Sequence, residues 1–319
     1  MPVSDTASST AAATTLSRPL FVIGDLHANY DACVAILRGL ELVDRGLAWQ
    51  APNVDVVQLG DVCDRGPNSR DIYELFMRLQ QEASAAGSSF EVLIGNHEVM
   101  NAFGMEQYTT EQEAAGYARN SGGSGWNERR AAFAPGGFVF EWLAERPVLH
   151  RVGPIVCGHG DLPMELREAQ LEHLDRAFRA EFVRQAPAAG VRPRELPALL
   201  FSGQLSVLWS RQAEDGGPQY GASLHEFLRR NGACVYVCGH TPQPEGQFKQ
   251  RYAGAYLCID TAMGFEASGV GARTALVIRP DTGAEQWSFG RGRGGSRAGS
   301  RVRRRTIELP LEWNSESGN

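Results

Sequence analysis

The stretch Leu59-Gly-Asp-Val-Cys-Asp-Arg-Gly66 completes an apolar run, 54–59, that is typical of a buried strand. The run ends in a glycine, and two acids and an arginine follow at once: Asp61, Asp64 and Arg65. A strand that presents these side chains at its carboxyl end is placed to bind a charged group. The sequence therefore predicts a polar site at this edge of a sheet.

Four further apolar runs end in a similar way. The runs 19–23, 90–94, 150–157 and 233–238 have the composition of strands, and a glycine follows or closes each of them. The polar residues that come next are Asp25 and His27, Asn96 and His97, His159, and His240. Apolar residues at helical spacing follow the first two strand ends of the chain, so strand and helix alternate. This alternation predicts an α/β core with one site at the strand ends.

The composition is that of an ordinary globular protein. The chain has 319 residues, of which 43% are hydrophobic and 21% charged, and a formal charge of -6. The length suits one large domain or two small ones. No apolar run approaches the ~18 residues that a membrane span needs, so no membrane contact is expected. The six cysteines are expected to be buried free thiols of a reducing compartment, since the chain is too long to need a disulfide framework.

The ends of the chain differ from its centre. Residues 1–18 are rich in Ser, Thr and Ala and are predicted to be a disordered leader. They lack the apolar core of a signal peptide and have a single arginine, Arg18, where a transit peptide would have more, which favours a cytoplasmic location and leaves organellar targeting open. Residues 290–319 form an Arg/Gly/Ser-rich tail with seven arginines between 291 and 305. We expect a solvated tail, and the alternative is an arm for an acidic partner or RNA.

Residues 19–289 are expected to form the main domain. Within it, 102–130 is predicted to be a loop or lid over the site, 163–230 a helical insertion, and 150–157 one strand or two. The stretches 252–260 and 273–289 are predicted to be strands of a second sheet. The segment 307–313 fits either a returning strand or a docking motif.

The polar residues at the strand ends suit a pair of divalent metal ions. Carboxylates and imidazoles are ligands for manganese, iron or zinc. A carboxylate such as Asp61 can bridge two ions, which would then hold a shared hydroxide and neutralise the charge of a phosphate. His97 follows Asn96 and should point away from the metal that Asn96 binds, so it could protonate a leaving group. Asp64 could hold its other nitrogen, and Arg65 could bind phosphate oxygens.

These motifs resemble the calcineurin-like metallophosphoesterases of the phosphoprotein phosphatase branch. The motifs that carry the resemblance are Gly24-Asp-Leu-His27, Gly60-Asp-Val-Cys-Asp-Arg-Gly66, Gly95-Asn-His-Glu98, His159 and His240. The continuation Glu98-Val-Met-Asn101 resembles the bacterial-type Shewanella-like phosphatases, and Trp209-Ser210-Arg211 is similar to a segment of the same family. Ala28 and Asp161 depart from the family pattern, where glycine is usual.

The resemblance implies a fold of two β-sheets sandwiched between helices, with a helical insertion. It also implies that Asp25, His27 and Asp61 hold one metal, and that Asp61, Asn96, His159 and His240 hold the other. His97 and Asp64 would be the catalytic acid pair. Arg65 would anchor the phosphate, with Arg211 a weaker candidate for a second contact.

The predicted function is a metal-dependent phosphatase that acts on phosphoserine, phosphothreonine or phosphotyrosine of a protein or peptide. The choice among these three stays open, as does the oligomeric state. Two alternatives remain. One is a dinucleoside polyphosphate hydrolase, which would need a base-stacking pocket from Trp126, Tyr108 or Trp209. The other is a non-catalytic binder that uses the arginine-rich tail for nucleic acid, which the intact ligand set argues against.

Overall fold

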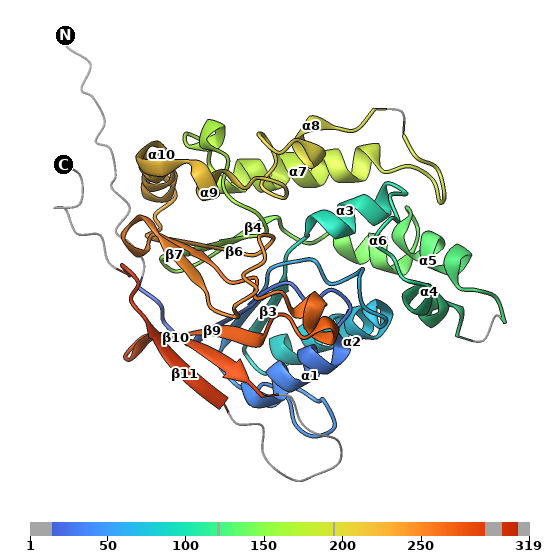
Figure 1. Ribbon diagram of the computed structural model, residues 1–319, viewed down its shortest axis with the longest axis horizontal. Helices are drawn as coiled ribbons and strands as arrows, with labels where there is room; N and C mark the ends of the chain where they lie inside the picture. The colour runs from blue at the N-terminus through green and yellow to red at the C-terminus, as the bar shows by residue number, and fades with distance from the viewer. Residues whose placement is uncertain (1–14, 120–121, 194, 291–301, 312–319) are drawn as a thin grey trace.

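Two β-sheets lie face to face at the centre of the protein in this computed structural model, which describes residues 15–119, 122–193, 195–290 and 302–311 (Figure 1). The larger sheet has the strand order β11-β10-β9-β1-β2-β3. Its strands are β1 (Leu20–Ile23), β2 (Asp55–Gln58), β3 (Ser89–Val92), β9 (Arg273–Arg279), β10 (Gly283–Phe289) and β11 (Val302–Ile307). The smaller sheet has the order β4-β5-β6-β8-β7. Its strands are β4 (Leu149–Val152), β5 (Ile155–Gly158), β6 (Val235–Cys238), β7 (Lys249–Arg251) and β8 (Tyr256–Cys258).

The core has two layers because the central strands are buried on both faces. Leu20 and Val22 of β1 share one apolar cluster with Val235 and Val237 of β6, which fills the space between the sheets. The alternate residues of β1, 21 and 23, belong to a second cluster that includes the helices. Successive side chains of a strand point to opposite faces, so a strand buried on both sides has a continuous apolar sequence. This layering confirms the predicted sandwich of two sheets between helices.

Helices cover the outer faces of both sheets (Figure 1). The helices α1 (Tyr30–Gly39) and α2 (Ser69–Ala85) pack on the larger sheet, against β9, β10 and β3, and α7 (Leu171–Gln185) packs against β4 of the smaller one. The other helices are α3 (Asn96–Ala102), α4 (Glu111–Ala118), α5 (Trp126–Phe133), α6 (Phe138–Leu143), α8 (Ala198–Phe201), α9 (Gln212–Asp215) and α10 (Gly217–Arg230). None of the helices in the described residues has the length and apolar content to cross a bilayer.

The assignment of 252–260 and 273–289 to one second sheet is wrong. The strand β8 pairs in parallel with β6 in the smaller sheet, whereas β9 pairs antiparallel with β1 in the larger sheet, with Phe21 opposite Val277. A pattern of side chains that repeats every two residues predicts a strand, but it carries no information about which other strand lies beside it. The stretch 150–157 contains two strands, β4 and β5, which pair as a hairpin.

The segment 102–130 is also different from its prediction, because much of it is helical. Ala114 and Tyr117 of α4 and Ala132 and Phe133 of α5 are buried. Gly125 precedes α5 with a φ of +84°, and a Cβ at this position would lie 1.8 Å from the Ala114 carbonyl oxygen. The packing of these small and aromatic residues stabilises two short helices that polarity and glycine content had concealed.

The arginine-rich tail is partly a strand. β11 pairs antiparallel with β10 and includes Arg303, Arg304 and Arg305, which are exposed as expected of a solvated tail, although they belong to a strand. Residues 1–14, 291–301 and 312–319 lie outside the described residues, and with them most of the predicted leader and four arginines of the tail. The helices α7 to α10 lie between β5 and β6, where a helical insertion was expected. All six cysteines are buried and free, as predicted.

Candidate metal centre

The predicted ligands lie just beyond the carboxyl ends of strands from both sheets. Asp25 follows β1, Asp61 follows β2 and Asn96 follows β3, while His159 follows β5 and His240 follows β6. All five side chains are buried, with exposed fractions of at most 6%. Loops that are distant in the sequence therefore meet where the edges of the two sheets come together.

Asp61 is shared by two groups of side chains that could each hold a metal ion. One group contains Asp61, His27 and His97, and the other contains Asp61, His159 and His240. The Oδ2 atom of Asp61 lies 3.6 Å from Nε2 of His27, and its Oδ1 atom lies 3.3 Å from Nε2 of His159. One oxygen thus faces each group, which is the arrangement expected of a bridging carboxylate.

Asn96 completes the surroundings of the second group, and Asp25 lies next to both groups. The Oδ1 atom of Asn96 lies 2.8 Å from Nε2 of His159 and 3.0 Å from Nδ1 of His240. Asp25 belongs to neither group, but its Oδ2 accepts a hydrogen bond of 3.0 Å from the backbone N–H of His240. Among the described residues, Asp25 Oδ1 and His240 Nε2 are buried polar atoms without a hydrogen-bond partner. Buried atoms of this kind need a partner, so the donor set fits divalent cations.

The charges of the centre are mutually dependent. Burial alone would raise the pKa of Asp61, but the surrounding imidazoles, of which His159 acts most strongly, hold it below its usual range. Burial raises the pKa of Asp25 well above its ordinary value, and the neighbouring acids Asp260 and Asp61 add to this effect. Burial also lowers the pKa of His27 to about 3. Carboxylates and imidazoles crowded together in this way are suited to cations.

His97 and Asp64 form the pair that the sequence suggested. Nδ1 of His97 lies 2.7 Å from Oδ2 of Asp64. Burial lowers the pKa of His97, but Asp61 and Asp64 outweigh it and hold the pKa above its ordinary value. Nε2 of His97 lies 3.8 Å from Asp61 Oδ2, so the ring points away from the group beside Asn96 and towards the group that contains His27.

The backbone of the centre adopts an uncommon conformation at several site residues. His27, Asp61, Asp64, Arg65 and His240 all have φ between +47° and +67°. Non-glycine residues seldom adopt this left-handed region, and they cluster at functional sites where tertiary contacts support them. The glycines of the motifs act mainly by allowing close approach. A Cβ at 239, for example, would lie 2.1 Å from Oδ1 of Asp25.

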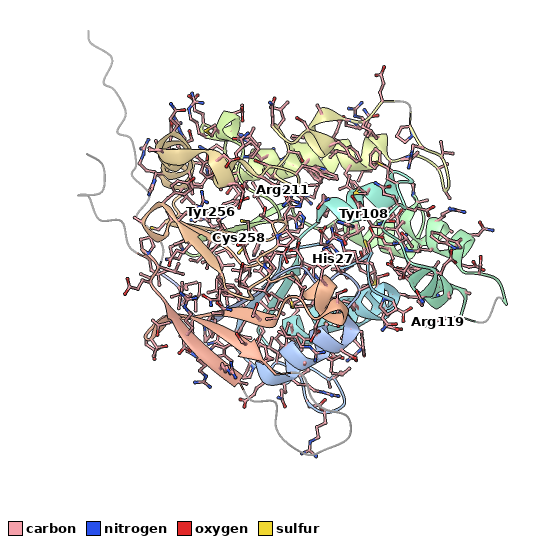
Figure 2. The ribbon with its side chains drawn as sticks, viewed as in Figure 1. His27, Tyr108, Arg119, Arg211, Tyr256 and Cys258 are labelled. Carbon is pink, nitrogen blue, oxygen red and sulfur yellow. The ribbon has the colours of Figure 1, made fainter. Side chains whose placement is uncertain are left out.

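Both predicted phosphate-binding arginines lie beside the centre, and Figure 2 labels one of them, Arg211, together with His27. Nη1 of Arg65 contacts Nε2 of His27, and the guanidinium lies between the exposed rings of Tyr108 and Phe265, at 5.6 and 5.0 Å from their centroids. Nη1 of Arg211 donates to Oγ1 of Thr241, the residue after His240, at 3.1 Å. The two arginines thus stand next to different metal-binding groups.

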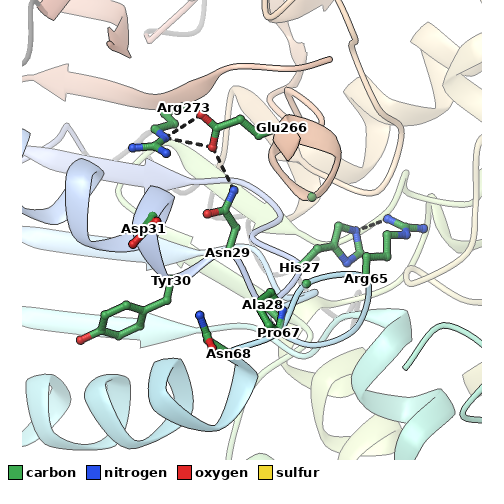
Figure 3. Close-up of a pocket in the computed structure, with 12 residues that line it drawn as sticks. His27, Ala28, Asn29, Tyr30, Asp31, Arg65, Pro67, Asn68, Glu266 and Arg273 are labelled. Carbon is green, nitrogen blue, oxygen red and sulfur yellow. Dashed lines mark hydrogen bonds and ion pairs between the residues drawn. The ribbon is translucent and has the colours of Figure 1, made fainter. Parts of the chain in front are cut away.

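A cavity of about 380 Å³ opens beside His27 and Arg65 (Figure 3). Its far wall contains Glu266, which accepts hydrogen bonds from Asn29 at 3.0 Å and from Nε of Arg273 at 2.8 Å. The cavity places polar and charged groups next to the arginine that was predicted to bind phosphate. Its mouth is therefore a suitable place for the part of a substrate that adjoins a phosphate.

Glu98, the last residue of the Gly95-Asn-His-Glu98 motif, holds the backbone of the centre in place. Its buried carboxylate accepts backbone N–H groups of Gly95, Asp61 and Val62 at 2.8 to 2.9 Å, and the hydroxyl of Tyr73 at 2.8 Å. These bonds fix the loop that carries Asp61 to the start of α3. Its position two residues after Asn96 was the signal available in the sequence.

Sequence reasoning also missed Asp260 and Arg129. Asp260 follows β8 as Asp61 follows β2, and burial raises its pKa to about 6. The same pattern of a strand followed by an acid could have identified it. Arg129 is buried in α5 and donates to Asp64 Oδ1 at 3.1 Å, which no local pattern indicates.

Asp161, which stands where the family pattern usually has glycine, has a structural role. Its carboxylate accepts from the hydroxyl of Tyr256 at 2.6 Å and from the N–H of Ala213 at 2.7 Å.

The chain is similar in sequence to known proteins. The family described as "Calcineurin-like phosphoesterase" matches residues 18–244. The chain is 29% identical over 252 residues to Shewanella-like protein phosphatase 1 of Plasmodium berghei, covering 76% of this chain and 67% of the relative. It is 35% identical over 281 residues to an uncharacterized protein of Schizosaccharomyces pombe, covering 81% and 76%.

The fold is similar to that of solved phosphatases. The structure of a cold-active protein tyrosine phosphatase aligns with a TM-score of 0.70 at 18% identity, covering 92% of this chain and 80% of the other. A protein serine/threonine phosphatase from Saccharomyces cerevisiae aligns with a TM-score of 0.55 at 18% identity, covering 93% and 82%. The resemblance inferred from the motifs is confirmed, and with it the prediction of a phosphoester-hydrolysing enzyme.

Proposed function

Because the chain belongs to the calcineurin-like phosphoesterase family, we propose that it is a metal-dependent protein phosphatase that hydrolyses phosphomonoesters of serine, threonine or tyrosine side chains. The observation that carries the proposal is the shared carboxylate of Asp61, which faces one metal-binding group with each oxygen. His97, whose carboxylate partner is Asp64, lies on the side of the centre that contains His27.

Six residues would hold the ions. Asp25, His27 and Asp61 would bind one, and Asp61, Asn96, His159 and His240 the other. Imidazole nitrogens with carboxylate and amide oxygens suit manganese, iron or zinc. When bound, two such ions would supply an activated water at neutral pH and neutralise charge on the phosphate.

The remaining residues would position the ester and move a proton. His97 donates its Nε2 proton to the departing oxygen, while Asp64 holds the ring through Nδ1 and stabilises its charged form. Arg65 and Arg211 bind phosphate oxygens from two sides, with the fork geometry that arginine offers to phosphate. Arg65 contacts His27 in the structure, so its guanidinium would have to turn to bind a phosphate.

The names of the relatives support phosphoproteins as substrates. The alternative, a dinucleoside polyphosphate, would require a ring on which a base can stack. Tyr108 is 46% exposed beside Arg65, whereas Trp209 donates its indole N–H to the Leu200 carbonyl and Trp126 to Glu111 on α4. Of the three, Tyr108 is the exposed ring beside the centre, whereas the ring of Trp209 lies 6.1 Å from that of His240 but is half-buried. Cytoplasmic location and the contacts of the arginine-rich tail stay predictions.

Phosphate release from defined substrates tests the proposal. The protein, loaded with manganese, is given phosphoserine, phosphothreonine and phosphotyrosine peptides and a dinucleoside tetraphosphate at equal concentrations. We expect turnover of at least one phosphopeptide above that of the dinucleotide, and its loss in Asp61→Asn. Asp71→Asn, which changes an exposed acid of α2, serves as the matched control and should retain activity. Metal-loaded protein that released phosphate only from the dinucleotide would overturn the proposal.

A further inference from the structure

The buried guanidinium of Arg129 lies directly behind the pair of His97 and Asp64. Its side chain is 1% exposed, and it comes from α5, which supplies none of the predicted metal ligands or catalytic residues. Nη2 donates to Oδ1 of Asp64 at 3.1 Å, whereas His97 Nδ1 meets the opposite oxygen, Oδ2, at 2.7 Å. We propose that Arg129 is a positioning residue that fixes the Asp64 carboxylate in the orientation in which it holds His97. The proposal rests on the function proposed above.

Arg129 supports both oxygens of Asp64. Besides its direct bond to Oδ1, it donates through Nη1 to Oδ1 of Asn101 at 2.6 Å. The amide of Asn101 in turn donates to Oδ2 of Asp64 at 2.9 Å. The hydroxyl of Thr109 adds a bond of 2.9 Å to Oδ1. A carboxylate held at both oxygens cannot rotate about its C–C bond without breaking bonds in a buried site, where an unpaired polar group is costly.

The positive charge of Arg129 also holds two neighbouring acids together. Nη2 lies 3.1 Å from Oε1 of Glu113, which itself accepts the backbone N–H of Asp64 at 3.1 Å. Two buried carboxylates therefore share one cationic nitrogen. Without that cation, Glu113 and Asp64 would face each other across a site of low dielectric and repel. Asp64 would then turn away from Glu113, and His97 would lose its fixed orientation.

Arg129 also has a packing role, and a test must separate the two. Its guanidinium lies 5.8 Å from the centroid of the Tyr117 ring and 4.8 Å from that of Phe133, so any substitution could loosen α4 and α5. Arg70 offers a matched control. It lies 5.8 Å from the same Tyr117 ring and donates to the Tyr117 carbonyl at 2.8 Å, but the structure gives it no contact with Asp64.

The readout is the dependence of rate on the leaving group. Phenyl phosphate releases a basic phenolate that needs a proton from His97, whereas 4-nitrophenyl phosphate releases an anion that is stable without one. In the manganese-loaded enzyme we expect Arg129→Gln to lower kcat about 30-fold for phenyl phosphate and about threefold for 4-nitrophenyl phosphate, with KM nearly unchanged. Arg129→Lys keeps the positive charge but loses the forked guanidinium. Its loss of kcat on phenyl phosphate should be smaller than that of Arg129→Gln.

Arg70→Gln should leave the ratio of the two rates at its original value. Equal losses on both substrates in the glutamine and lysine variants, or a change confined to KM, would overturn the positioning role. His97→Asn separates the two proposals, since it should change the ratio at least as strongly as Arg129→Gln. If His97→Asn leaves the ratio unchanged, the assigned role of His97 fails. If it changes the ratio and both Arg129 variants do not, only the present inference fails.

Discussion

Asp61 and Asp64 lie three residues apart in one loop, both buried and both with positive φ, yet their surroundings differ completely. Asp64 accepts hydrogen bonds from four side chains: His97, Asn101, Thr109 and Arg129. Asp61 accepts the backbone N–H of His97 at 3.0 Å, and its other near neighbours are imidazole nitrogens at 3.3 to 3.8 Å.

The difference separates a side chain that other side chains already hydrogen-bond from one that we propose to bind metal ions. Buried polar groups are almost always paired in folded proteins. The Asp64 carboxylate already has its partners, so its role is to hold a neighbour in place. The surroundings of Asp61 include the unpartnered atoms Asp25 Oδ1 and His240 Nε2, which fits the proposal that cations bind there.

The largest effect should come from Asp61→Asn, which removes the charge shared by both metal-binding groups. We expect metal content to fall and phosphatase activity to drop at least about 1,000-fold, which corresponds to about 4 kcal/mol in the activation free energy. Elemental analysis alongside 4-nitrophenyl phosphate hydrolysis measures both. Full metal occupancy in this variant would contradict the bridging role of Asp61.

Asp64→Asn should keep its metal but lose stability. Burial alone would raise the pKa of Asp64, but its hydrogen bond with His97 and the charge of Arg129 hold it below the usual range. A depressed pKa contributes stability that is present above the unfolded-state value of about 4 and is lost as pH falls through the folded-state pKa. The variant should therefore unfold about 3 kcal/mol more easily at pH 7, because a buried charge loses its partner.

Urea unfolding at a series of pH values tests the predicted direction in which the stability contribution of Asp64 changes with pH. The difference between the parent protein and Asp64→Asn should shrink as the pH falls below about 4. A difference that stayed constant to pH 3 would mean that the charge of Asp64 adds nothing to stability.

Manganese should stabilise the parent protein and Asp64→Asn alike. A ligand at about 100 times its Kd adds about 2.7 kcal/mol to the free energy of unfolding, so thermal unfolding should move to higher temperature. Asp61→Asn should show little or no shift. If manganese also failed to stabilise Asp64→Asn, Asp64 would be needed for metal binding, and its role would not differ from that of Asp61.

The smallest effect should come from one of the four donors to Asp64. Thr109→Val removes one hydroxyl and should lower the free energy of unfolding by about 1 kcal/mol. Thr109→Ser keeps the donor and should stay close to the parent protein. Equal losses in both variants would assign the effect to packing instead of the hydrogen bond.

Much of the centre was predictable because its donors are local in sequence. A glycine and a polar residue at the end of each apolar run identified Asp25, Asp61, Asn96, His159 and His240, and the structure brings all five to one place. Asp260 has the same signature after β8 and could have been found in this way. The helices α4 and α5 were missed because they are polar and the stretch 121–125 between them is rich in glycine, and packing around Tyr117 and Phe133 outweighs that signal.

The amino-acid sequence by itself determined which side chains stand at the strand ends, and hence the metal chemistry, because donor type and strand period are properties of neighbouring residues. Tertiary structure alone decided that β9 pairs with β1 and β8 with β6, and that Arg129 of α5 reaches Asp64 across 65 positions. Such contacts depend on which buried surfaces fit together and which buried charges must be paired, and both are set only when distant segments pack.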